Sequence, residues 1–461
     1  MNNSFFCHKY LIFLLSFFSP MIIDVGGEVS PSFLFILLTL PFWSRYLNFR
    51  NDVVLMKFLP LFYVILLVQI IWIPFSHTEL LTQIKGLMIT VSGLLHFLFY
   101  YFAYRRSQEI IKWAALGTFL SSFFFVNVLA EVAGGDFGMW KFQIFPRLVS
   151  AGVLLYLWYC NKGWMKNIAP ILLIAVGGIG LLTGARSSGL VPFSAGIIAF
   201  VLLKNKNIRI YRIKNYLIVG MLLLYGIYAL IYVPNVMNGK ISGGNSKQLQ
   251  VTENPYNPVN LLMIGRTDAI VPFIAFMDRP ITGWGYRTKD PGGKYHLIIT
   301  KLKNEKSSSM AKYKINEKNI PGHSVWGYYS CSYGIVVFVA LGLILLKTWR
   351  LVYYSLLVHD KYLLYRLFCV ISVTWNILFS PISHFKWLPA TIALVIVLSI
   401  KALNDFMNTN EIQDESGENI GCDSNLRLSR KSKKDNRIST SNWRKHCTTY
   451  NHCASIKNSL N

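Results

Sequence analysis

Apolar segments follow one another along most of this chain, and they constrain its fold more than any other feature. We count twelve, each bounded by polar or turn-forming residues, and a membrane helix needs about 20 mostly apolar residues. Hydrophobic residues make up 53% of the 461 positions and charged residues 15%, against about 25% charged in soluble domains. The segments are approximately 10–23, 29–43, 53–75, 86–104, 113–131, 143–160, 168–183, 187–203, 215–234, 325–346, 363–380 and 385–403.

This pattern predicts an all-α integral membrane protein with about 12 transmembrane helices. It excludes a soluble multidomain enzyme, a disordered chain and a small secreted domain held by disulfides. The formal net charge of +25 would suggest nucleic acid as a partner of a soluble protein. Here the basic residues fall mostly between apolar segments, so membrane topology and anionic lipid explain the charge better, and we expect no nucleic acid.

The basic residues alternate between rich and poor connections, which predicts the orientation of the helices. One set of connections holds 17 Lys and Arg residues and the alternate short connections hold five, among them Arg186. Basic loops stay in the cytoplasm. We therefore expect both termini to be cytoplasmic and the poor connections to face outward.

Four regions follow from this topology. We expect helices 1–9 in residues 1–234, a long outward loop in 235–324 and helices 10–12 in 325–403. Residues 404–461 are polar and predict a basic, disordered cytoplasmic tail. Within the long loop, apolar residues at helical spacing end at Asp278-Arg279-Pro280, so we expect one or two helices on the outer rim of the bundle.

A single arginine in an outward turn is the sharpest functional candidate. Arg186 lies between two apolar segments and is followed by Ser187 and Ser188. A guanidinium can bind phosphate through two parallel hydrogen bonds, and N–H groups at the start of the next helix would assist it. The competing interpretation, at about even odds, is an arginine that extends toward ordinary lipid head groups.

The long loop supplies further charged candidates. Arg266 begins its predicted helix, and a structural role would pair it with Asp268. Arg279 and Arg287 are weaker candidates, since a cation at a helix end also suits the helix dipole. His323 stands where the loop meets the tenth apolar segment, and a histidine there can accept a proton from a sugar hydroxyl.

Several short motifs occur in an order that resembles the O-antigen ligase and polymerase superfamily. They are Thr-Gly-Ala-Arg-Ser-Ser-Gly at 183–189, Gly265-Arg266, Gly-Trp-Gly at 283–285, and Gly-His-Ser at 322–324 with Gly334. The last motif matches the ligase pattern of His, then Asn, Ser or Gln, nine residues and Gly, but Val337 stands where Gly, Thr or Tyr is usual. The motifs cover about 165–345.

The resemblance implies a twelve-helix bundle in the bacterial inner membrane with its active site facing the periplasm. Such proteins move a glycan from an undecaprenyl diphosphate carrier to a sugar hydroxyl, without metal or other cofactor. Arg186 and Arg266 would bind the diphosphate, with Ser187 and Ser188 assisting, and His323 would orient or deprotonate the acceptor. Asp268, Arg279 and Arg287 remain secondary candidates.

Two functional alternatives stay open. Within the resemblance, a ligase that uses lipid A–core as acceptor is slightly favoured over a polymerase that joins lipid-linked repeat units. A flippase or other transporter is the alternative from a different class, since twelve helices suit one. A transporter would, however, be expected to show two related halves and charges along a central path, whereas the notable charges here cluster at one face.

Overall fold

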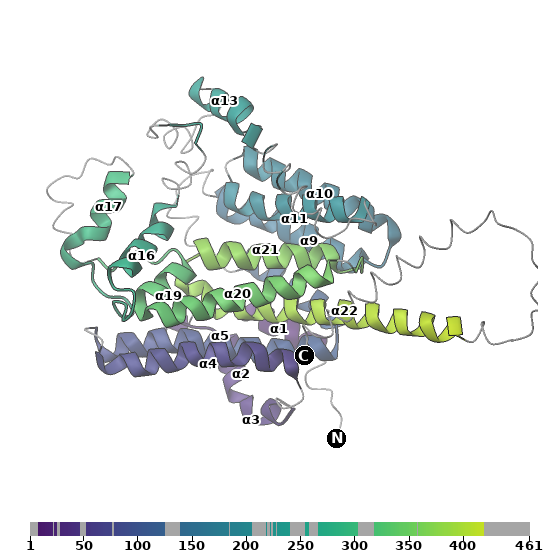
Figure 1. Ribbon diagram of the computed structural model, residues 1–461, viewed down its shortest axis with the longest axis horizontal. Coiled ribbons are helices and arrows are strands. Elements are labelled where there is room, and N and C mark those ends of the chain that lie inside the picture. Colours follow the sequence, from purple (N-terminus) through teal and green to yellow (C-terminus); the bar gives the residue numbers. More distant parts are fainter. Residues whose placement is uncertain are drawn as a thin grey trace, which may run out of the picture.

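The computed structural model is an all-helical bundle apart from one very short strand pair (Figure 1). It describes residues 8–21, 23–24, 28–46, 52–75, 78–124, 139–183, 185–204, 228–239, 254–257, 266–302, 318–356 and 358–418, and single positions within 218–226. The strand pair, Ile23–Asp24 with Glu28–Val29, is antiparallel. The all-α prediction is confirmed for these ranges.

Five helices of the described ranges are long and apolar enough to cross a membrane: Val53–Phe75, Leu80–Arg106, Gly163–Leu182, Ile335–Ser355 and His384–Asn408. Shorter apolar helices lie at Lys9–Phe18, Ser188–Lys204, Tyr228–Met237 and Leu363–Phe379. Large apolar side chains on these helices point outward, for example Leu67 at 56% and Leu172 at 52% exposure. Outward apolar surfaces of this extent are typical of helices that contact lipid.

The helices follow the predicted apolar segments closely in most of the chain. The first half contains α1 (Lys9–Phe18), α2 (Pro31–Leu38), α3 (Leu40–Trp43), α4 (Val53–Trp72), α5 (Leu80–Arg106), α6 (Glu109–Phe124), α9 (Phe145–Tyr159), α10 (Gly163–Leu182) and α11 (Arg186–Lys204). The second half contains α13 (Val233–Met237), α16 (Thr267–Asp278), α17 (Lys294–Leu302), α19 (Val325–Tyr333), α20 (Ile335–Ser355), α21 (Leu363–Phe379) and α22 (Leu388–Glu418). Part of the predicted ninth segment, 215–234, lies outside the described residues.

Three predicted boundaries differ from the structure. The second segment is broken at Thr39 into α2 and α3. The tenth, expected as one helix over 325–346, is divided at Gly334 into α19 and α20. The last helix, α22, continues to Glu418, so the stretch 404–418 is helical where we expected a disordered tail. This helix runs beyond the bundle (Figure 1), and the remainder of the predicted tail, 419–461, lies outside the described residues.

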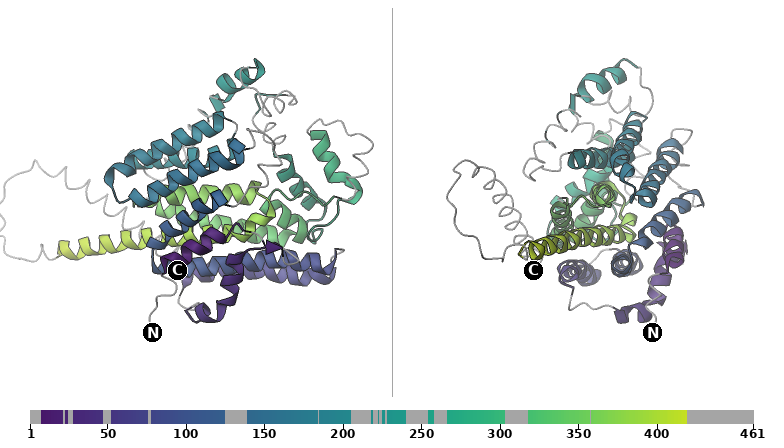
Figure 2. Two further views of the ribbon diagram at one scale, coloured as in Figure 1. Left: turned by 180° about the vertical axis from the view of Figure 1, so that it is seen from behind. Right: turned by 90° about the vertical axis from the view of Figure 1, so that its right-hand side faces the viewer.

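Polar contacts join the neighbouring ends of α4, α5 and α20 at one end of the bundle. Asp52 caps α4 and accepts hydrogen bonds from the Tyr101 hydroxyl at 2.8 and 3.0 Å, and Arg105 also pairs with it. Lys347 on α20 donates to the Lys57 carbonyl at 2.7 Å. Figures 1 and 2 show α16 and α17 at the opposite end.

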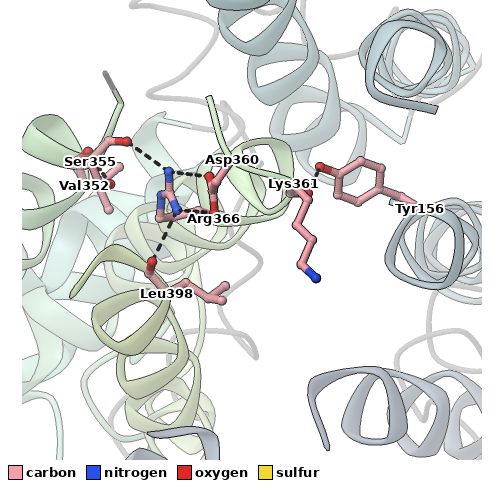
Figure 3. Close-up of polar contacts among 7 residues, drawn as sticks. All are labelled: Tyr156, Val352, Ser355, Asp360, Lys361, Arg366 and Leu398. Carbon is pink, nitrogen blue, oxygen red and sulfur yellow. Dashed lines mark hydrogen bonds and ion pairs between the residues drawn. The ribbon is translucent and has the colours of Figure 1, made fainter. Parts of the chain in front are cut away.

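A buried arginine joins α20, α21 and α22 near the end of the bundle that holds Asp52 (Figure 3). Arg366, fully buried at the start of α21, pairs with Asp360 at 3.0 Å and donates to the carbonyls of Ser355 at 3.0 Å and Leu398 at 3.3 Å. The neighbouring Lys361 carbonyl accepts a hydrogen bond from Tyr156 of α9. These contacts fasten the α20–α21 turn to α22 and α9, a structural role.

The long loop contains a small folded unit at the other end of the bundle. Apolar side chains of α16 and α17, among them Tyr295, share a core with Ile320 and Cys331. Residues on either side of α17 meet in an antiparallel bridge between Lys289 and Asn319, flanked by backbone hydrogen bonds. In the described parts of this loop α16 ends at Asp278, as expected, and α17 follows it.

Candidate functional site

The turn that carries Arg186 is held by a close pair of helices. Helices α10 and α11 are antiparallel and pack against each other through Gly177, Gly189 and Gly196. A Cβ on Gly189 would lie 2.8 Å from the Gly177 carbonyl oxygen, and one on Gly196 would lie 2.7 Å from the Pro170 carbonyl oxygen. Small residues allow such close helix packing in membranes. The backbone of Arg186 is therefore fixed at the first residue of α11.

The side chains of this turn are described in part. Those of Arg186 and Ser187 lie outside the described part of the structure. Ser188 is half-buried, and its hydroxyl donates to the Ala185 carbonyl at 3.1 Å. At the preceding helix end, the Trp140 indole donates to the Thr183 hydroxyl at 2.8 Å. The Ser188 proton is thus used within the first turn of α11.

Arg266 lies against two aromatic rings rather than in open solvent. It is the N-cap residue of α16, and its guanidinium carbon lies 5.2 Å from the ring centre of Trp375 and 5.8 Å from that of Phe379, both on α21. Burial lowers the pKa of this guanidinium. A cation at a helix N-terminus opposes the helix dipole, so aromatic packing is what holds Arg266 there. Asp268, half-buried, lies in the first turn of the same helix.

His323 is exposed, but its backbone is fastened on both sides. The Gly322 carbonyl accepts a hydrogen bond from the Ile382 N–H at 3.3 Å. Ser324 caps α19 by accepting from the Gly327 N–H at 2.9 Å, and its hydroxyl also contacts the Ile377 carbonyl at 3.5 Å. The imidazole therefore projects from a fixed point at the junction of the loop and α19.

The end of α21 is the element that brings these residues together. Arg266 packs on Trp375 and Phe379, and the segment 322–324 bonds to Ile377 and to Ile382 just beyond the helix. Helix α11 also packs along α21. Its far end lies near the start of α21, where His359 contacts the Leu202 carbonyl at 3.0 Å. The backbone of Arg186 is therefore at the same end of the bundle as Arg266 and His323.

A strap of residues 279–287 connects α16 to the helices of the bundle. The N–H groups of Trp284 and Gly285 donate to the carbonyls of Cys331 and Ser332 at 2.7 and 2.9 Å. The Pro280 carbonyl accepts from the Ile335 N–H at 2.7 Å, across the break between α19 and α20. The strap thus satisfies backbone groups that the broken helix leaves open.

The two secondary arginines lie at opposite ends of this strap. Arg279 is exposed at the C-terminal end of α16, with its guanidinium carbon 4.0 Å from the ring centre of Trp284. A 12-residue helix is about 18 Å long, which separates Arg279 from Arg266. Arg287 is exposed near the start of α19, and its N–H donates to the Tyr328 hydroxyl at 2.8 Å. The structure therefore brings Arg287, and not Arg279, toward His323.

The two acids nearest α17 have structural partners. Asp278 accepts hydrogen bonds from Lys294 and from the Tyr295 hydroxyl, both at 2.6 Å, and these contacts lower the pKa of its carboxyl. Buried Asp290 accepts from the His296 N–H at 2.8 Å and from its ring Nδ1 at 2.7 Å. Within the described ranges, no group of three or more His, Cys, Asp or Glu side chains is arranged to hold a metal ion.

Three residues that contact the candidate arginines were not predicted from the sequence. Trp375 and Phe379 lie one helical turn apart and form the surface under Arg266, while Tyr328 lies between Arg287 and Gly322. The aromatic pair at i, i+4 near the end of an apolar segment was the available signal. His96 of α5 makes an interhelical contact to the Ser32 hydroxyl of α2 at 3.2 Å, which is a structural role.

Comparison with protein-family models, curated proteins and solved structures finds no match to this chain. The family resemblance therefore stands on the motifs and their order in the sequence.

Proposed function

We propose that the protein is a membrane glycosyltransferase of the O-antigen ligase or polymerase kind, which transfers a glycan from undecaprenyl diphosphate to a sugar hydroxyl. One observation carries the proposal. Arg266 packs on aromatic rings in the last turns of α21, and Ser324, next to His323, contacts a carbonyl of the same turns. The backbone of Arg186 lies at this end of the bundle as well. These residues come from three motifs that are up to 137 positions apart in the chain.

The chemistry of the site suits a diphosphate leaving group. Arg266 is partly removed from water between two rings, so an anion that pairs with it offsets the desolvation of its charge. Arg186 would neutralise charge on the same leaving group, and stabilisation of this kind often contributes more to catalysis than any other effect. His323, exposed beside them, would orient or deprotonate the acceptor hydroxyl. The donor is already activated, so the proposed reaction uses no cofactor or metal.

Within this class we propose a ligase with lipid A–core as acceptor, and a polymerase of lipid-linked repeat units as the close alternative. The proposed topology has about 12 membrane helices, cytoplasmic termini and the α16–α17 unit in the periplasm of a bacterial inner-membrane protein. A transporter is less well supported, because Arg186, Arg266 and His323 are confined to one end of the bundle while the buried pair Arg366–Asp360 has structural partners.

Replacement of single arginines tests the proposal. Arg186→Ala or Arg266→Ala should lower transfer at least about 100-fold, as does loss of one transition-state donor in other enzymes. Arg266→Lys should also be impaired, since lysine lacks the planar fork that stacks and binds in two places. Arg45→Ala, which removes an exposed arginine from η2 (Ser44–Tyr46), is the matched control. Immunoblots of membranes check insertion, and near-normal transfer by both alanine variants would overturn the assignment.

A further inference from the structure

The backbone of Arg287 has a conformation that arginine rarely adopts. Its φ is +52°, and it is the one non-glycine residue with positive φ in the described ranges. This left-handed conformation brings the Cβ close to the following carbonyl oxygen, so glycine or asparagine occupies it more readily. An observed outlier of this kind is a reason to look for a role of the side chain.

Contacts to two helices hold this backbone in place. The Arg287 N–H donates to the Tyr328 hydroxyl of α19 at 2.8 Å. One residue earlier, the Tyr286 carbonyl accepts from the Gln83 amide of α5 at 3.3 Å, and the Tyr286 ring meets the Tyr328 ring edge-on at 6.0 Å. The surrounding structure therefore fixes where the exposed Arg287 side chain begins.

A single tyrosine ring separates Arg287 from the segment of His323. The hydroxyl of Tyr328 contacts the Arg287 backbone, and the face of the same ring lies against Gly322, where an added Cβ would be 3.0 Å from it. His323 follows Gly322 directly, and both His323 and Arg287 are exposed. The Tyr328 ring therefore lies between the backbones of Arg287 and Gly322, and the side chains of Arg287 and His323 are both open to water.

Arg287 and Arg266 differ in their surroundings. Arg266 is half-buried on the rings of α21. Arg287 is exposed, its guanidinium carbon lies 5.7 Å from the centre of the Tyr286 ring, and its backbone contacts Tyr328. A transfer reaction needs one subsite for the donor and another for the acceptor. Arg266 belongs to the proposed donor subsite, which leaves Arg287 on the acceptor side.

From this arrangement we infer that Arg287 binds a phosphate group of the acceptor and so positions its hydroxyl at His323. The inference rests on the proposed function. A guanidinium binds phosphate through two parallel hydrogen bonds and remains charged at any working pH. Arg287 is thus a specificity residue for phosphorylated acceptors, distinct from the pair that would bind the donor diphosphate.

Transfer assays in membranes test this assignment. Membranes would supply the endogenous lipid-linked glycan as donor, and the acceptor lipid would be purified from a strain that lacks the protein and used either intact or after phosphatase treatment. The variant Arg287→Asn removes the charge while tolerating positive φ. Lys301→Gln, which removes an exposed charge from α17 of the same unit, is the matched control, and thermal unfolding of each variant monitors folding.

Arg287→Asn should raise the half-saturating concentration of intact acceptor about 10-fold, as expected from loss of a charge-assisted hydrogen bond. The donor dependence should stay within about twofold. With dephosphorylated acceptor, wild type and Arg287→Asn should behave alike. The inference is wrong if the variant changes donor dependence, affects both acceptors equally or has no effect. Absence of transfer by the wild-type protein would instead reject the proposed function itself.

Discussion

At the scale of single residues, aromatic rings determine what each cation of the loop does. Trp375 and Phe379 hold Arg266 at the end of α21, while Trp284 packs against Arg279 at the C-terminal end of α16. Cation–π contacts of this kind stabilise by about 0.5–1 kcal/mol when exposed and more when desolvated. Arg266 was predictable as a candidate from its motif, but its aromatic partners lie more than 100 residues further along the chain. No local pattern encodes such a contact.

The contact of Asp278 with Lys294 and Tyr295 predicts a pH dependence of the loop unit. These hydrogen bonds lower the carboxyl pKa below its ordinary value, which is about 3.9. A depressed pKa contributes stability that is present above about pH 4 and is lost as pH falls through the folded-state value. Amide hydrogen exchange in α16 and α17, corrected for intrinsic rates, should therefore speed up in acid.

The variant Asp278→Asn isolates this effect. It should exchange faster than wild type at pH 7 and should show a smaller further change below pH 4, because the titrating group is gone. Lys301→Gln, on α17 and outside the contact, should behave as wild type. If Asp278→Asn keeps the acid response of the wild-type protein, the contact contributes nothing to the unit.

At the scale of elements, the break between α19 and α20 is the feature that arranges the candidate site. Gly334 has φ +81° and ψ −166°, and the Pro280 carbonyl bonds to Ile335 just beyond it. The strap that reaches this point also carries Arg287. A discontinuous helix next to a proposed substrate site is a recurring arrangement in membrane proteins, where irregular backbone lies within protein or at a cavity.

Gly334→Ala tests the importance of this break. Its φ and ψ belong almost only to glycine, at a cost of about 1–3 kcal/mol for other residues, and an added Cβ would overlap the Ile281 carbonyl. We expect a lower midpoint of thermal unfolding and a loss of transfer activity. Gly163→Ala, where a Cβ would meet nothing within 4 Å, should leave both unchanged. Equal behaviour of the two variants would show that the strap adapts without cost.

The element scale also shows where sequence prediction succeeded and where it did not. Helix α16 was predictable because apolar residues at helical spacing end at Asp278-Arg279-Pro280. The division at Gly334 was not, because a glycine within an apolar run also fits an unbroken membrane helix, where small residues allow close packing. Only the tertiary contact with the strap, more than 50 residues earlier, distinguishes the two.

At the scale of the whole molecule, the two ends of the bundle carry different kinds of charged residue. At one end the charges are paired and structural, as in Asp52 with Tyr101 and Arg366 with Asp360. The other end also holds structural pairs, Asp278 with Lys294 and Asp290 with His296. In addition, Arg287 and His323 are exposed there, and Arg266 lies on aromatic rings. The alternation of basic connections predicts that the first of these ends is cytoplasmic and that the second faces outward. A chemical site at one end only is what the proposed transfer reaction requires.

The most direct test of this account is a surface-glycan gel of a strain that lacks the protein, with lipid-linked material analysed alongside. The proposal predicts that long glycan is lost from its acceptor while its precursors remain on the undecaprenyl carrier. Bare lipid A–core with long chains on the carrier would identify a ligase, and single repeat units on lipid A–core would identify a polymerase. An unchanged pattern of both surface and lipid-linked glycan would contradict the proposed function.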